Sequence, residues 1–137
     1  MRCACGAAYD QRYRPDVLAP GLAGEVSASV TDRDTALDVG SGEVRVLATP
    51  RVVALVEAAS VDALAGALDK ETTSVGTRVE LDHLAPSPVG ATVTARAELV
   101  EVAGRRLTFD VTLIQDGAVV ARGRLTRTLV PRARFPS

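Results

Sequence analysis

The sequence predicts an α+β domain in which an antiparallel sheet wraps around one long helix. A segment in the first half of the chain is apolar at nearly every position and is long enough to form a helix. After Thr72 the chain consists of stretches in which apolar and polar residues alternate, separated by short turns. Such alternation is typical of strands with one buried face. Since the sheet has only this one helix to cover it, we expect the sheet to enclose the helix.

The helix is predicted from Pro50 to about Leu68. Thr49 is a residue type found at helix N-caps, and proline suits the first turn. Glu57 is the exception within an otherwise apolar segment, and burial would withdraw its carboxylate from water. A buried carboxylate needs a partner or a function, so Glu57 is a candidate active-site residue. The apolar positions, which cover nearly every side of the helix, are Val52, Val53, Leu55, Val56, Ala58, Ala59, Val61, Leu64 and Leu68.

Strands are predicted on both sides of the helix. Alternation predicts a first strand from Glu25 to Leu37, and two glycines in 38–47 predict a mobile loop before the helix. Within the strand predicted over 74–84, His83 shares a side with the apolar residues and Gly76 lies on the other side. Glycine-containing turns at Gly104 and at Asp116-Gly117 predict hairpins. The strands predicted after the helix span 74–84, 92–102, 107–113 and 119–129.

The length of 137 residues predicts one domain. We expect this domain to span 21–131, with an irregular leader over 1–20 and a short tail over 132–137. Cys3 and Cys5 lie in the leader. A structural zinc site needs four ligands, which these two cysteines and one distant histidine do not supply. No metal is therefore expected.

Composition argues against two classes of partner. The net charge of −1 and the 3% aromatic content do not favour nucleic acid, which is bound through phosphate neutralisation and base stacking. No apolar run reaches the roughly 18 residues of a membrane span, and residues 1–15 lack the apolar centre of a signal peptide. The sequence predicts a cytoplasmic protein with no membrane partner.

Four residues appear in an order and spacing that resembles a known family. Thr49 opens the helix, Glu57 lies two turns into it, Gly76 lies in the following strand, and His83 ends that strand. This set resembles the fluoroacetyl-CoA thioesterases, a family with the hotdog fold. The stretches 88–95 and 101–107 are similar to that family as well. The resemblance covers roughly Glu25 to Val130.

The resemblance implies hydrolysis of an acyl-CoA thioester. It implies Thr49, Glu57 and His83 as the catalytic set and Gly76 as the residue whose backbone meets the substrate carbonyl. It also implies a homodimer whose two sheets join edge to edge, and no cofactor, because coenzyme A is part of the substrate. Members that act on fluoroacetyl-CoA resemble one another in having phenylalanines just before the helix. Residues 42–48 contain no aromatic residue, so the acyl group stays open.

Each of these residues also has a purely structural interpretation. Glu57 can pair with a strand arginine, His83 can be a satisfied core residue, Thr49 can serve only as a helix cap, and Gly76 can mark a bulge. The arginines near the end of the chain are expected on a solvated face, or at the phosphates of coenzyme A. These arginines are Arg122, Arg124, Arg127, Arg132 and Arg134.

Two alternative functions remain open from sequence. A hotdog dehydratase or hydratase that acts on an acyl thioester also needs an acid–base pair, which Glu57 and His83 can provide. A non-catalytic acyl-CoA-binding module would use Glu57 only as a paired core residue. Release of free coenzyme A separates the thioesterase from both.

Overall fold

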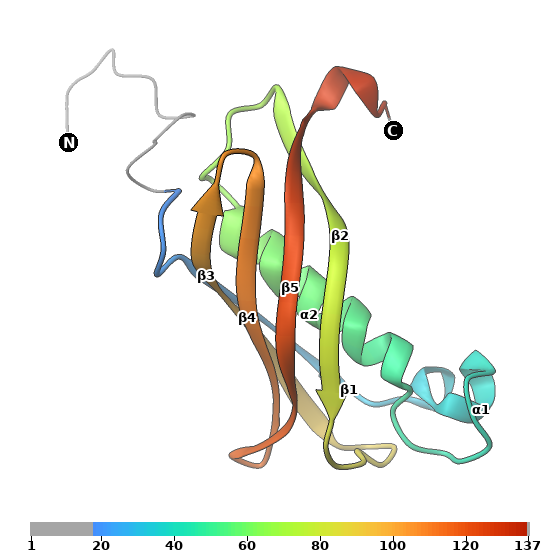
Figure 1. Cartoon of the computed structure of the whole chain (residues 1–137). Helices are drawn as coiled ribbons and strands as arrows, with labels where there is room; N and C mark the ends of the chain where they lie inside the picture. The colour runs from blue at the N-terminus through green and yellow to red at the C-terminus, as the bar shows by residue number, and fades with distance from the viewer. Residues whose placement is uncertain (1–17, 137) are drawn as a thin grey trace.

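The computed structural model describes residues 18–136, which form one five-stranded antiparallel sheet and one long helix (Figure 1). Cys3, Cys5 and most of the predicted leader lie outside the described residues. The strands occur in the order β1-β3-β4-β5-β2, so β1 and β2 are the two edges. The predicted α+β class is confirmed. The strands are β1 (Ala23–Ser29), β2 (Thr72–His83), β3 (Thr92–Ala103), β4 (Arg106–Gln115) and β5 (Ala118–Pro131), and the helix is α2 (Thr49–Leu64).

The core lies between α2 and one face of the sheet, and the alternating pattern of the sequence builds it. In the central strands β3 and β4 one side is fully buried over most of the strand, as predicted, while the other side is exposed or half-buried. Asp116 and Gly117 both have positive φ, 51° and 78°, in the hairpin between β4 and β5. This geometry is the one an Asp-Gly turn favours. The largest fully buried side chains of the sheet are Phe109, Leu99, Leu107, Leu113 and Leu125.

Helix α2 packs on the sheet along one face only. Its buried side includes Val52, Val56, Ala59 and Ala63, which join the core. The helix packs closely over β1, because a Cβ on Gly24 would overlap the backbone of the helix. Its opposite side is exposed and mostly apolar, with positions 54, 58, 61 and 65 open to solvent. The prediction of a helix buried nearly all round is therefore wrong for a single chain.

The segment before α2 differs most from the prediction. The first strand ends at Ser29 instead of Leu37, and a short 3₁₀ helix, η1 (Asp32–Asp34), and a one-turn helix, α1 (Ala36–Val39), follow it. Hydrogen bonds from Ala36 and Leu37 to the backbone carbonyls of 46 and 44 fold the predicted loop back on itself. This segment is thus tied down by main-chain bonds.

The long helix and its neighbouring edge strand also show smaller differences. Helix α2 ends at Leu64, four residues before the predicted end, and a turn with Gly66 at φ 81° follows. Strand β2 pairs with β5 over its whole length, but the register shifts between Gly76 and Arg78. The extra residue in β2 is therefore Thr77, a β-bulge. A second 3₁₀ helix, η2 (Arg132–Arg134), follows β5.

Candidate active site

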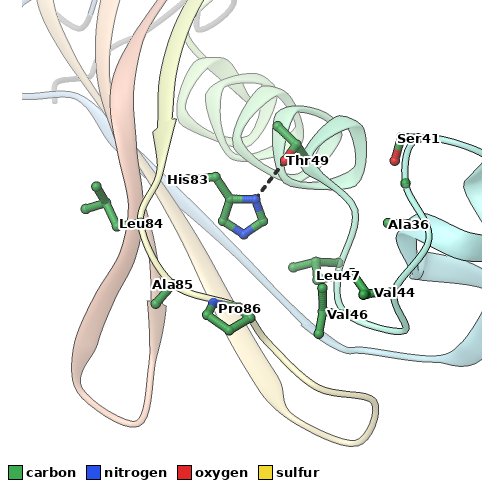
Figure 2. A pocket seen from close by; sticks show the side chains of 11 residues that line it. Ala36, Ser41, Val44, Val46, Leu47, Thr49, His83, Leu84, Ala85 and Pro86 are labelled. Atoms are coloured by element: carbon green, nitrogen blue, oxygen red, sulfur yellow. Dashed lines mark hydrogen bonds between the residues drawn. The ribbon is translucent and has the colours of Figure 1, made fainter.

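Thr49 and His83 meet where α2 begins and β2 ends. The Thr49 hydroxyl oxygen lies 2.8 Å from His83 Nδ1, within hydrogen-bond distance (Figure 2). The N-cap residue of α2 is Ala48, which makes no side-chain cap, and Thr49 is the first helical residue. The expectation that Thr49 caps the helix is therefore wrong. Its hydroxyl bonds the imidazole instead.

The His83 imidazole is mostly neutral at pH 7, because its pKa is lowered. Burial lowers the pKa of the His83 imidazole below its ordinary value of 6.5, because the charged form loses hydration. Within residues 18–136, no protein group bonds the other ring nitrogen, Nε2, although that atom is buried. A neutral imidazole beside a hydroxyl can accept its proton, which is the arrangement that activates a threonine or a water for attack on a carbonyl.

A cavity of about 360 Å³ opens beside this pair. One wall comes from the segment before α2 and the other from the residues that follow β2 (Figure 2). Apart from Ser41 and the Thr49–His83 pair, the lining side chains are aliphatic, and Gly42 adds none. The aliphatic members are Ala36, Val44, Val46, Leu47, Leu84, Ala85 and Pro86.

Glu57 and Gly76 meet farther along the same two elements. A Cβ placed on Gly76 would overlap Glu57 Oε2, so the carboxylate lies directly against the glycine. The Glu57 side chain is 39% exposed and is not desolvated as predicted. Gly76 faces α2, whereas strict alternation in β2 placed it on the side away from His83. The absence of a side chain at this position gives the Glu57 carboxylate its place.

Arg127 of β5 holds that carboxylate, and it is buried instead of lying on the solvated face expected for it. Arg127 Nη1 lies 3.5 Å from Glu57 Oε2, and the arginine side chain is only 8% exposed. Its Nε donates to Ser74 Oγ at 2.8 Å, Nη2 donates to the Ser74 carbonyl at 3.2 Å, and Nη1 donates to Ser60 Oγ at 3.4 Å. The other four arginines of the expected solvated face are exposed, as predicted. Arg127 is the exception.

The electrostatics of Arg127 follow from its position. Burial lowers the pKa of its guanidinium, and the charge of Glu57 opposes this shift. Its pairing with Glu57 is the strand-arginine contact that the structural alternative for Glu57 expects. The sequence held a signal for this buried arginine, because Arg127 shares the strand side of Leu125 and Leu129.

The four predicted residues thus form two contacting pairs, Thr49–His83 and Glu57–Gly76. Both pairs lie between α2 and β2. Thr49 and Glu57 are eight residues apart, which corresponds to about 12 Å along a helix axis. The structure gives no hydrogen bond or ion pair between the two pairs among the described residues.

Among residues 18–136 there is no cluster of three or more His, Cys, Asp or Glu side chains suited to a metal. No helix in the same range is long and apolar enough to cross a membrane.

Known proteins share this fold. A crystal structure of a mutant of the fluoroacetyl-CoA-specific thioesterase FlK, in complex with fluoroacetate and CoA, superposes with a TM-score of 0.80 and 29% identity. The match covers 87% of this chain and 100% of that chain. A hot-dog-like protein from Thermanaerovibrio acidaminovorans gives a TM-score of 0.76 at 22% identity, over 89% and 96% of the two chains. The fold is therefore the hotdog fold.

Sequence comparison gives the family. A fluoroacetyl-CoA thioesterase from Streptantibioticus cattleyicolor is 37% identical over 90 residues, which are 66% of this chain and 65% of that protein. The chain thus spans slightly less than two thirds of the length of this curated relative. The family model described as FlK, fluoroacetyl-CoA-specific thioesterase, matches residues 30–133. This range includes both pairs of the candidate site and Arg127. The chain belongs to the FlK family of hotdog thioesterases.

Proposed function

We propose that this protein is an acyl-CoA thioesterase, which hydrolyses a coenzyme A thioester to a free acid and coenzyme A. The observation that carries the proposal is the 2.8 Å contact between the Thr49 hydroxyl and His83 Nδ1 beside a cavity. Support also comes from the family, and from the FlK mutant structure that contains fluoroacetate and CoA. The acyl group of the substrate is left open, because no aromatic residue occurs in 42–48.

The chemistry assigned to the pair is proton transfer. His83 accepts the Thr49 hydroxyl proton, and the hydroxyl oxygen attacks the thioester carbonyl. The C–S bond breaks, and the imidazolium returns its proton to the departing thiolate. Water then cleaves the acyl-threonine ester with His83 again as the base, which restores the hydroxyl and releases the acid. Thr49 is the first residue of α2. The helix dipole there favours the negative charge that develops on the carbonyl oxygen.

Glu57 and Gly76 are assigned supporting roles at the same seam between α2 and β2. Glu57 lies about 12 Å along α2 from Thr49, so its carboxylate, held by Arg127, can bond the hydrolytic water in place of His83 only where a second copy brings it to the acyl group. Gly76 and His83 are about 20 Å apart along β2, so the Gly76 backbone is the proposed contact of a substrate carbonyl bound across two copies of the chain. A purely structural Glu57 is the competing interpretation, and the Arg127 ion pair favours it. Kinetics of Glu57→Gln decide between the two: loss of turnover with an intact fold supports catalysis, and unchanged turnover supports structure alone.

The site is proposed to be completed in a homodimer. Strand β2 is an edge of the sheet, and its residues 76–80 are exposed in a single chain. The exposed apolar side of α2, at positions 54, 58, 61 and 65, is likewise uncovered. Edge strands and apolar patches are typical contact surfaces. Two copies that meet at β2 would cover both surfaces near Glu57.

We also propose a cytoplasmic location, since a coenzyme A thioester carries charged phosphates that do not cross membranes unaided.

Coenzyme A release tests the proposal directly. Purified protein is incubated with acyl-CoAs of increasing chain length, and free thiol is followed with a thiol reagent. Thr49→Val and His83→Asn should each lower kcat by about 10² to 10⁴, the range typical of general acid–base catalysis. Absence of thiol release from every substrate would contradict the thioesterase. Hydration or dehydration of the acyl chain without thiol release would support a dehydratase, and binding without turnover would support an acyl-CoA-binding module.

A further inference from the structure

Asp34 joins two segments that are separate in the sequence. It is the last residue of η1, just after β1, and its side chain is 18% exposed. Its Oδ2 accepts hydrogen bonds from the Thr31 amide and the Thr31 hydroxyl, both at 2.8 Å. Its Oδ1 accepts from Arg51 Nε at 3.0 Å, and its backbone carbonyl accepts from the Ala48 amide at 2.9 Å. One residue thus ties the end of β1 to the start of α2.

The two contacts on α2 lie on either side of Thr49. Ala48 precedes Thr49, and Arg51 follows it by two positions. The first turn of a helix has amide groups without intrahelical partners and is prone to fray. In α2 the N-cap residue is alanine, with no side-chain cap, so the usual stabilisation is absent. Asp34 supplies an attachment for this turn from outside the helix.

Neighbouring contacts anchor the same region to the cavity wall. Thr35 pairs with Leu47 in an isolated bridge, and Val46 pairs with Pro88 in another. The Thr35 side chain, fully buried, donates to the Asp32 carbonyl and accepts from the Asp38 amide. The segment from η1 to Thr49 therefore has several main-chain attachments. Asp34 is the residue in it whose side chain reaches α2 through a charged partner.

We propose that Asp34 is a positioning residue that fixes the first turn of α2 and so places the Thr49 hydroxyl on His83. This inference rests on the proposed thioesterase function only for its effect on turnover. Misplacing a reacting group by about 1 Å can cost about 100-fold in rate, so a distant anchor can control catalysis without touching substrate. The placement itself has a direct readout. His83 is the only histidine in the chain, so its ring nitrogens and carbons give one set of nuclear magnetic resonance signals.

The test compares three variants with the wild type. Arg51→Gln removes the charged link to α2 but leaves Asp34 bonded to Thr31. Because the Arg51 side chain is 42% exposed, we expect this variant to fold. Asp34→Asn weakens both links. Asp32→Asn is the matched control, since that carboxylate lies in the same 3₁₀ helix, is 74% exposed, and among residues 18–136 has only a 3.9 Å ion pair to Arg45. Circular dichroism establishes that each variant is folded, and Arg51→Gln decides alone if Asp34→Asn does not fold.

We expect Arg51→Gln and Asp34→Asn to move the His83 titration midpoint upward toward 6.5, because a loosened turn admits water to the ring. We expect kcat to fall by about tenfold or more with KM within about twofold, as for lost positioning of a reacting group. Asp32→Asn should change neither quantity. The inference is overturned if the His83 midpoint in Arg51→Gln equals that of the wild type. If the midpoint moves but no acyl-CoA is hydrolysed by the wild type, the positioning stands and the proposed function falls.

Discussion

Arg127 and Glu57 form an ion pair in which the arginine is buried and the carboxylate is partly open to solvent, with Nη1 and Oε2 3.5 Å apart. Three further hydrogen bonds to Ser60 and Ser74 fix the guanidinium. The carboxylate is therefore oriented by strand β5 as well as by its own helix. A guanidinium bonded in this way has little freedom to follow the carboxylate if Glu57 moves. Any role of Glu57 in catalysis depends on this fixed partner.

Removing the arginine should therefore destabilise the protein. Arg127→Met leaves the Glu57 carboxylate without its ion pair and the Ser74 hydroxyl without its donor, and we expect a loss of about 2 kcal/mol in the free energy of unfolding. This value is below the usual cost of breaking a buried ion pair, because Glu57 is 39% exposed and water can replace part of the interaction. Urea denaturation gives the measurement. Arg124→Met is the control, since Arg124 is exposed on the same strand and its 3.1 Å pair with Asp110 should be worth less than about 1 kcal/mol. Equal losses in the two variants would contradict the structural importance of Arg127.

Gly76 should tolerate a side chain better when Glu57 is shortened. Gly76→Ala places a methyl group where Glu57 Oε2 lies, so the carboxylate must leave its position beside Arg127. Because the clashing atom is the end of a flexible, 39% exposed side chain, we expect Gly76→Ala to cost about 1 kcal/mol in the native background, mainly through the loss of the Glu57–Arg127 contact. The cost should be smaller in Glu57→Ala, because the clashing atom is absent. A double-mutant cycle by urea denaturation measures the coupling. A coupling of zero would mean that the two residues do not contact in solution.

The activity should persist into mildly acidic solution. Burial lowers the pKa of His83 below 6.5, so the imidazole stays neutral, and able to accept a proton, at pH values where an exposed histidine is half charged. The acid limb of kcat/KM should therefore have its midpoint below pH 6.5. The lowered pKa of His83 also affects stability. The unfolded state binds the proton at a higher pH than the folded state, so the free energy of unfolding falls as the pH drops from 6.5 toward the lower folded-state pKa. A pH–rate profile from 4.5 to 8.5 provides the test. An acid midpoint above 6.5 would assign the limb to another group.

Asp34 should make stability depend on pH in the acid range. Hydrogen bonds from the Thr31 amide, the Thr31 hydroxyl and Arg51 hold the pKa of this carboxyl below its ordinary value of 3.8. Its stabilisation is therefore complete above 3.8 and is lost as the pH falls through the lower folded-state value. At pH 7 we expect Asp34→Asn to cost about 1–3 kcal/mol, as for hydrogen bonds to a charged group. In thermal denaturation the variant and the wild type should converge as the pH falls toward 2. A difference that is independent of pH would contradict this origin.

The sheet could be predicted from sequence because each central strand buries one side and exposes the other. In β3 and β4 the period of two is uninterrupted over the residues that face the helix, and the Asp-Gly turn fixes the following hairpin. The segment after β1 could not be predicted in the same way. Its alternation continues past Ser29, but Thr31 and Asp34 bond each other's backbone and side chains and so form a turn. Local side-chain bonds compete with strand pairing there.

The candidate site could be predicted only in part. The sequence predicts the four residues of the site, which are Thr49, Glu57, Gly76 and His83. Tertiary structure decides which of them touch one another. A threonine at a helix start has the same appearance whether its hydroxyl caps the helix or bonds a distant imidazole. For Arg127 the sequence indicated the position of the side chain but not its partner. Its position on the inward side of β5 was visible, yet the partner that makes an inward arginine tolerable lies 70 residues earlier, in α2.

The bulge at Thr77 has a geometric consequence for the whole site. Gly76 and His83 are seven positions apart, an odd number, so on a regular strand their side chains would point to opposite faces of the sheet. The extra residue at Thr77 shifts the phase of the alternation by one, and Gly76 and His83 then face the same helix. One inserted residue thus brings both halves of the site to a single surface. If Thr77 were kept and paired regularly, Gly76 and His83 would lie on opposite sides of β2, although no functional group would be removed; deletion of Thr77 would leave them six positions apart and on the same side.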